Sequence, residues 1–124
     1  MVRYLFLLVP LLLGQQAEDK PGRVILKKTK DPEREWALYI PGSYKPGVPI
    51  PFVLSSHGKD GRGKGEINQW ESLAQKHKFI VACPDYSQAS GRPGTFDEDE
   101  KVTTEIYEYL TKNFSIDKRY GMIT

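Results

Sequence analysis

The sequence has few of the residues that define a disulfide-rich domain, a nucleic-acid-binding protein or a metal site. Among its 124 residues Cys83 is the only cysteine, so an internal disulfide is excluded. The 18 basic and 16 acidic side chains nearly balance without a long basic run, which argues against a nucleic-acid partner. The two histidines, His57 and His77, lack the spacing of a zinc site. We expect no metal and no cofactor.

No apolar run is long enough to span a bilayer, but a shorter one lies near the N-terminus. The stretch "LFLLVPLLLG" follows Arg3 and precedes a small residue, Ala17. This order is typical of a cleaved export signal rather than a retained membrane anchor. We therefore expect a signal peptide over residues 1–17 and one domain over residues 18–124. The location would be secreted or periplasmic, with membrane contact only during export.

The spacing of apolar residues predicts an α/β domain with the element order β-β-β-α-β-α-β. The first two strands are expected to form an antiparallel hairpin at a sheet edge, and in the second Trp36, Leu38 and Ile40 share one face. The apolar run that forms the fourth strand does not alternate, which is typical of a strand buried on both faces of a parallel sheet. The expected strands cover residues 22–28, 35–41, 52–56, 78–85 and 119–124.

Two amphipathic helices are predicted between the later strands. The first becomes periodic after "GEIN", and the second begins near Asp97 and Glu100, which resemble a capping pair. Each helix has one apolar face that would pack on the sheet. These faces consist of Ile67, Trp70, Leu73 and Ala74 in the first helix, and of Val102, Ile106, Tyr109, Leu110 and Phe114 in the second.

A glycine-rich loop, "SSHGKDGRGKGE", follows the third strand. Its Gly58, Gly63 and Lys64 satisfy the phosphate-binding spacing G-x-x-x-x-G-K, but glycine stands where Ser or Thr would reach magnesium. The helix is also expected to begin too late to direct its N-terminus at a phosphate. A phosphate-binding module that uses Lys59, Arg62 and Lys64 is therefore a minor alternative. The same loop suits an oxyanion hole, since α/β-hydrolases take one oxyanion-binding N–H from the loop after the third strand.

Three stretches together resemble the N-terminal part of secreted α/β-hydrolase-type esterases, similar to the polyhydroxybutyrate depolymerase and feruloyl esterase group. They are "LYIPGSYKPGVPIPFVLSSHG", "WESLAQKHKFIVACPD" and "IDKRYGMIT", in the order of the family. The resemblance implies a serine hydrolase that cleaves a small-molecule or polymeric carboxylic ester through an acyl-enzyme. It also implies an oxyanion-hole loop of His57, Gly58 and Lys59, in which the Lys59 main chain donates and His57 supports the loop.

The G-x-S-x-G nucleophile elbow of that family is absent from the sequence. The resemblance places the elbow, and the rest of the Ser/Asp/His triad, beyond Thr124. We therefore expect the chain as given to be truncated before the elbow and inactive alone. Trp70 and Tyr86 are candidates for the rim of a substrate pocket.

The competing interpretation is a non-catalytic exported binding domain. In it the glycine-rich loop and the aromatic residues Trp70, Tyr86 and Phe96 would contact a glycan or an acyl ligand. Cys83 belongs to neither interpretation, because its apolar strand predicts an inert thiol in the core.

Overall fold

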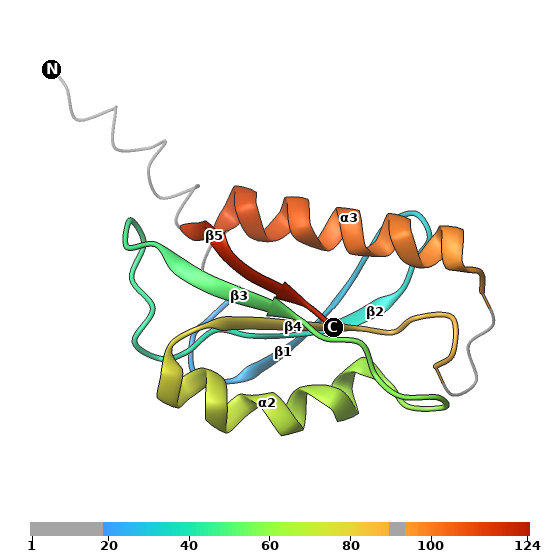
Figure 1. Ribbon diagram of the computed structural model, residues 1–124, viewed down its shortest axis with the longest axis horizontal. Coiled ribbons are helices and arrows are strands. Elements are labelled where there is room, and N and C mark those ends of the chain that lie inside the picture. The colour runs from blue at the N-terminus through green and yellow to red at the C-terminus, as the bar shows by residue number, and fades with distance from the viewer. Residues whose placement is uncertain (1–18, 90–93) are drawn as a thin grey trace, which may run out of the picture.

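The computed structural model describes residues 19–89 and 94–124, which form a single sheet with a helix on each face (Figure 1). The expected signal peptide over residues 1–17 lies outside the described residues. Within them, no helix is both long enough and apolar enough to cross a membrane. In chain order the elements are β1 (Val24–Lys28), β2 (Glu35–Tyr39), β3 (Ile50–Leu54), α2 (Gly63–His77), β4 (Ile80–Pro84), α3 (Phe96–Asn113) and β5 (Ile116–Ile123).

The predicted element order β-β-β-α-β-α-β is confirmed, and the strands lie in the spatial order β1-β2-β4-β3-β5. β1 and β2 form the expected antiparallel hairpin, with β1 at one edge of the sheet. β2 is antiparallel to β4, whereas β3 is parallel to both β4 and β5. The carboxyl ends of β3, β4 and β5 therefore point to the same edge, where the loops that follow them meet.

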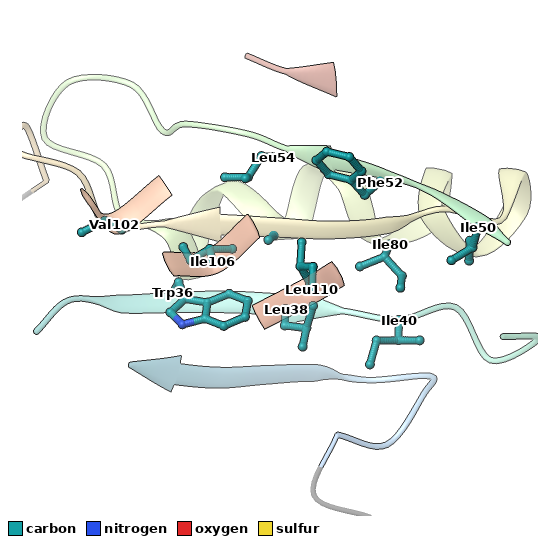
Figure 2. Packing of buried hydrophobic residues seen from close by; sticks show 11 residues of the cluster. Trp36, Leu38, Ile40, Ile50, Phe52, Leu54, Ile80, Val102, Ile106 and Leu110 are labelled. Atoms are coloured by element: carbon teal, nitrogen blue, oxygen red, sulfur yellow. The ribbon is translucent and has the colours of Figure 1, made fainter. Parts of the chain in front are cut away.

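One face of the sheet packs against α3. The predicted alternation of β2 is confirmed, because Trp36, Leu38 and Ile40 are all buried in the cluster on this face. Figure 2 shows these side chains beside Ile106 and Leu110 of α3. Two further predicted members of the α3 face, Tyr109 and Phe114, are half-buried against the same cluster, and Val102 is fully buried in it.

The opposite face packs against α2. Ile67 and Ala74 are fully buried, and Trp70 packs beside them against Phe79, with a ring-centroid distance of 6.0 Å. The prediction for Leu73 is wrong, since 46% of this residue is exposed. A helix turns 100° per residue, so a side chain at the margin of the apolar face extends beyond the strands that the helix covers.

β3 begins two residues earlier than predicted, at Ile50, and includes Pro51. Proline has no N–H to donate to a neighbouring strand, which is why it is uncommon inside sheets. The pairing between β3 and β5 shifts in register between Ile50 and Phe52, at the position of this proline. The irregularity accommodates a residue that a regular ladder would exclude.

Both helix starts also differ from the predictions. α2 begins at Gly63, so the residues "GEIN" are helical rather than a connection. α3 is capped by Thr95 and Glu98, not by Asp97 and Glu100. The Thr95 hydroxyl accepts a hydrogen bond from the Glu98 N–H at 3.2 Å, and the Glu98 carboxylate accepts one from the Thr95 N–H at 3.0 Å. The reciprocal capping box satisfies two donors at the helix end.

Candidate functional site

Three chain segments converge at the carboxyl edge of the parallel strands. The loop 55–62 follows β3, and residues 85–89 follow β4. The Asp60 N–H donates to the Gln88 carbonyl at 2.7 Å, which joins the two loops. Thr124, after β5, donates its N–H to the Leu54 carbonyl at 2.9 Å and accepts from the Ser56 N–H at 3.0 Å. The end of β5 therefore lies directly beside the beginning of the glycine-rich loop.

His57 connects the two loops through both of its ring nitrogens. Its Nε2 accepts a hydrogen bond from the Tyr86 N–H at 2.9 Å, and its Nδ1 lies 2.6 Å from the Gly58 carbonyl oxygen. Since a backbone N–H can only donate, Nε2 carries no proton, and the neutral Nδ1–H tautomer satisfies both contacts. His57 is thus placed to hold the shape of the loop, with both ring nitrogens engaged by the backbone.

Gly58 and Lys59 lie on the exposed part of this loop. The Gly58 carbonyl accepts a hydrogen bond from the Gly61 N–H at 3.0 Å, which closes a tight turn. Within residues 19–89 and 94–124, the N–H groups of Gly58 and Lys59 donate to no acceptor. A pair of adjacent unpaired N–H groups on a turn held by its neighbours is the kind of arrangement that binds an oxyanion.

Asp85 occupies the N-terminus of α2. Its carboxylate is fully buried, and Oδ1 accepts from the Gly63 N–H at 2.7 Å. Oδ2 accepts from Arg62 Nε at 2.8 Å and lies 2.7 Å from Arg62 Nη2. The hydrogen bonds and charge of Asp85 raise the pKa of the Arg62 guanidinium.

This geometry bears on the phosphate hypothesis. The expectation that α2 starts too late to face a phosphate is wrong, because the helix begins at Gly63. However, the positive end of the helix already binds a carboxylate of its own chain, and Arg62 is paired with the same group. Of the three cations in that hypothesis, Lys59 and Lys64 are exposed and form no ion pair with another described residue. The arrangement thus favours an internal structural use of this helix end over phosphate binding.

A buried arginine fixes the loop after β4, and sequence reasoning missed it. Arg34 donates to the Asp85 carbonyl at 3.1 Å, to Asp99 Oδ1 at 3.0 Å and to Glu98 Oε1 at 3.2 Å. Asp99 also accepts from the N–H and the hydroxyl of Ser87, at 2.9 and 2.7 Å. The acidic first turn of α3 thus anchors the loop as well as complementing the helix dipole. No local signal reveals this, because Arg34 and Asp99 are 65 residues apart.

The two candidate pocket-rim residues lie on opposite faces of the sheet. Tyr86 packs on the α3 face beside His57, with ring centroids 6.4 Å apart, and its hydroxyl bonds to Thr103. Burial raises the pKa of the Tyr86 phenol. Trp70 packs on the α2 face, and its Nε1 donates to Glu66 at 3.2 Å. The structure therefore places Tyr86 directly against the loop at His57, whereas Trp70 reaches the loop only through Glu66, which also accepts from the Ser55 hydroxyl.

The two serines at the start of the loop, Ser55 and Ser56, are not arranged as nucleophiles. Ser55 is buried, and its hydroxyl donates to Glu66 Oε2 at 2.8 Å. Ser56 Oγ donates to the Thr124 carbonyl at 2.8 Å. Neither hydroxyl contacts a histidine within the described residues, and in that part of the chain no group of three His, Cys, Asp or Glu side chains is placed to hold a metal. The described site consists of a loop with free N–H donors and its supports.

The arrangement of strands, helices and converging loops is that of the N-terminal half of α/β-hydrolase esterases, matched over about 82% of the chain. No protein-family model and no curated protein matches the sequence. The likeness is therefore one of fold, at sequence identities too low to show more.

Three solved structures illustrate this likeness of fold. The serine hydrolase FphF of Staphylococcus aureus, which binds fluorophosphonates, matches with a TM-score of 0.63 and 18% identity, over 83% of this chain and 46% of its own. The poly(3-hydroxybutyrate) depolymerase LpqC of Bordetella parapertussis matches with a TM-score of 0.63 and 17% identity, over 87% of this chain and 46% of its own. A ferulic acid esterase of Anaeromyces mucronatus matches with a TM-score of 0.59 and 17% identity, over 82% of this chain and 47% of its own. This chain spans less than half the length of each.

Proposed function

We propose that this chain is the N-terminal part of an exported serine hydrolase that acts on carboxylic esters. The observation that carries the proposal is the pair of free N–H groups at Gly58 and Lys59, on a loop that lies beside the end of β5. A nucleophile delivered after a strand in the position of β5 would stand next to these donors. The three solved structures above are named as a serine hydrolase, a poly(3-hydroxybutyrate) depolymerase and a ferulic acid esterase, which supports this reaction class.

In the proposed reaction the chain contributes electrostatic stabilisation. Attack on an ester carbonyl converts its oxygen into an oxyanion, and preorganised N–H donors stabilise the charge as it develops. The main chain of Lys59 is the principal donor, Gly58 leaves room for the substrate, and His57 holds the turn in shape. The ester is a small molecule or a polymer outside the cytoplasm. Export would depend on Arg3 and the apolar stretch before Ala17, which lie outside the described residues.

The first test is to read the coding sequence past Thr124. A continuation that encodes G-x-S-x-G, followed by an Asp and a His, would support the hydrolase. A stop codon directly after Thr124 would favour a non-catalytic binding domain instead.

If the coding sequence continues past Thr124, two substitutions at Lys59 test the loop in the full-length protein. Lys59→Pro removes the backbone N–H, and we expect kcat for p-nitrophenyl ester hydrolysis to fall by about 100- to 1,000-fold. Lys59→Ala keeps the N–H and removes only the side chain, so it is the matched control and should retain activity within about threefold. Circular dichroism verifies that both variants fold. Equal losses in the two variants would assign the effect to the lysine side chain and contradict the proposed donor.

A further inference from the structure

A buried serine directly after β3 lies on the otherwise apolar face of the sheet that packs against α2. Val53 belongs to the cluster on this face, and Ser55 lies two residues later, on the same side of the strand. Only 1% of Ser55 is exposed, and a buried hydroxyl is costly unless it is hydrogen-bonded. The hydroxyl donates to Glu66 Oε2 of α2 at 2.8 Å. Glu66 therefore supplies the acceptor that this position in the core requires.

The hydrogen bonds around Ser55 all run toward the Glu66 carboxylate, which can only accept. The single hydroxyl hydrogen of Ser55 goes to Glu66, so Thr124 is the donor in the 3.2 Å contact between Ser55 Oγ and Thr124 Oγ1. Trp70 Nε1, one turn further along α2, donates to the same Glu66 oxygen at 3.2 Å. These four side chains, the Glu66 network, join α2 to the ends of β3 and β5.

The network adds a side-chain contact to a residue that the backbone of β3 already holds. The Thr124 N–H donates to the Leu54 carbonyl at 2.9 Å. Its carbonyl accepts from the Ser56 N–H at 3.0 Å and from Ser56 Oγ at 2.8 Å. With the bond from its hydroxyl to Ser55, the position and the side-chain direction of Thr124 are both set. Any residue that follows Thr124 would leave β5 from this fixed point.

We propose that Glu66 is a positioning residue for ester hydrolysis, which acts through Ser55 on the end of β5. The inference rests on the proposed function, in which the nucleophile follows β5 and faces the N–H donors of Gly58 and Lys59. Those donors stabilise an oxyanion only where it forms within hydrogen-bond reach of them, and a displacement of about 1 Å can cost about 100-fold in rate. The network keeps the start of the nucleophile turn at a constant distance from the donors.

The kinetics of the full-length protein test this role through two substitutions at Glu66. Glu66→Ala removes the acceptor, and we expect kcat for p-nitrophenyl butyrate to fall by about 10- to 100-fold while KM stays within about threefold. Glu66→Gln keeps an acceptor oxygen and should restore kcat to within about threefold of the original value. Gln69→Ala is the matched control, because Gln69 is exposed on the same helix, and it should change neither constant.

Substitutions at the other end of the network test the route through Ser55. Thr124→Val keeps the shape of the side chain and removes its hydroxyl, so it should lower kcat by about tenfold, as should Ser55→Ala. The double variant should be no slower than either single variant, because both substitutions break the same link. Thr124→Ser keeps the hydroxyl and should restore kcat. Losses that multiply in the double variant would overturn the proposed route.

Hydrogen exchange separates positioning from a general effect on stability and does not depend on catalysis. In Glu66→Ala the N–H groups of Ser56 and Thr124 should exchange about tenfold faster, whereas those of β2 should be unchanged. Equal acceleration throughout the sheet, a rise in KM at constant kcat, or equal losses of kcat in Glu66→Ala and Glu66→Gln would each overturn the proposal.

Failure of the proposed function gives a different result. A full-length protein that has no turnover and forms no adduct with a serine-directed phosphonate would contradict the hydrolase itself. The exchange rates at Ser56 and Thr124 would still decide whether Glu66 holds the end of β5 in place.

Discussion

At the scale of the residue, buried polar and reactive groups hold the loops together rather than acting on a ligand. Asp85 uses both carboxylate oxygens on its own chain, and His57 uses both ring nitrogens. Cys83 lies fully buried in β4, in agreement with its predicted role as an inert thiol. The groups left free for chemistry are backbone N–H donors on the turn, which no side-chain motif specifies.

Cys83 gives a prediction at this scale. Burial, followed by the charge of Glu66, raises the pKa of its thiol from 9.0 to about 12. We expect iodoacetamide at pH 8 to leave the native chain unmodified, because the reactive thiolate is scarce and enclosed. In 6 M guanidinium chloride alkylation should go to completion, as measured by mass spectrometry. Rapid alkylation without denaturant would contradict the buried position.

The same shift predicts a loss of stability in alkali. The pKa of the Cys83 thiol is higher in the folded chain than in the unfolded chain. The protonated thiol therefore contributes fully to the free energy of unfolding below about pH 9, and this contribution is lost as the pH rises from 9 toward 12. A Cys83→Ala variant lacks this group. Its free energy of unfolding should therefore fall less steeply over this interval than that of the original chain, as measured by urea titration.

At the scale of the element, the start of α2 explains part of the glycine-rich loop. A Cβ at Gly63 would lie 2.0 Å from the Cys83 carbonyl oxygen, so only glycine allows the helix to begin against β4. Gly65, one position beyond Lys64, has no atom within 4 Å of where its Cβ would be. Of the two glycines of the phosphate-like spacing, close packing requires Gly63, whereas Gly58, like Gly65, has no atom within 4 Å of where its Cβ would be.

A matched pair of substitutions tests this difference. Gly63→Ala should lower the free energy of unfolding by about 1–3 kcal/mol, because the methyl group overlaps a backbone atom. Gly65→Ala should raise it by up to about 1 kcal/mol, since alanine is the better helix former at an exposed helical position. Urea unfolding followed by circular dichroism measures both. Similar effects of the two substitutions would show that the close contact is absent.

At the scale of the whole molecule, the sheet separates the two helices and decides which residues can meet. α2 and α3 lie on opposite faces of the sheet (Figure 1). Tyr86 packs on the α3 face and Trp70 on the α2 face, so the sheet separates them. The carboxyl ends of β3, β4 and β5 meet at one edge, which gathers the glycine-rich loop, Tyr86 and Thr124. In the proposed hydrolase these residues would supply the oxyanion-hole side of the site.

Among residues 19–89 and 94–124 no Ser/His/acid triad is assembled, and this predicts the catalytic behaviour of the 124-residue chain. We expect no hydrolysis of p-nitrophenyl acetate or butyrate above a heat-denatured control, because neither Ser55 nor Ser56 has a base beside it in the described part of the chain. Turnover that a serine-directed phosphonate abolishes would contradict this, and would require a nucleophile outside the arrangement described above.

The sequence by itself determined the element order, the face of each residue in β2 and the apolar face of α3. These follow from periodicity, which is a local property: side chains alternate along a strand and repeat every 3.6 residues around a helix. The start of α2 was less predictable from the sequence. Gly63 packs closely against the backbone of Cys83, which lies 20 residues further along the chain.

Only the tertiary structure decided how the candidate site is assembled. The bond from Tyr86 to His57, the binding of Asp85 at the start of α2 and the position of Arg34 under the β4 loop all join residues remote in sequence. Such contacts depend on the spatial order of the strands in the sheet, which local patterns do not encode. The placement of Trp70 on the face opposite Tyr86 has the same cause, since it follows from the face of the sheet that α2 covers.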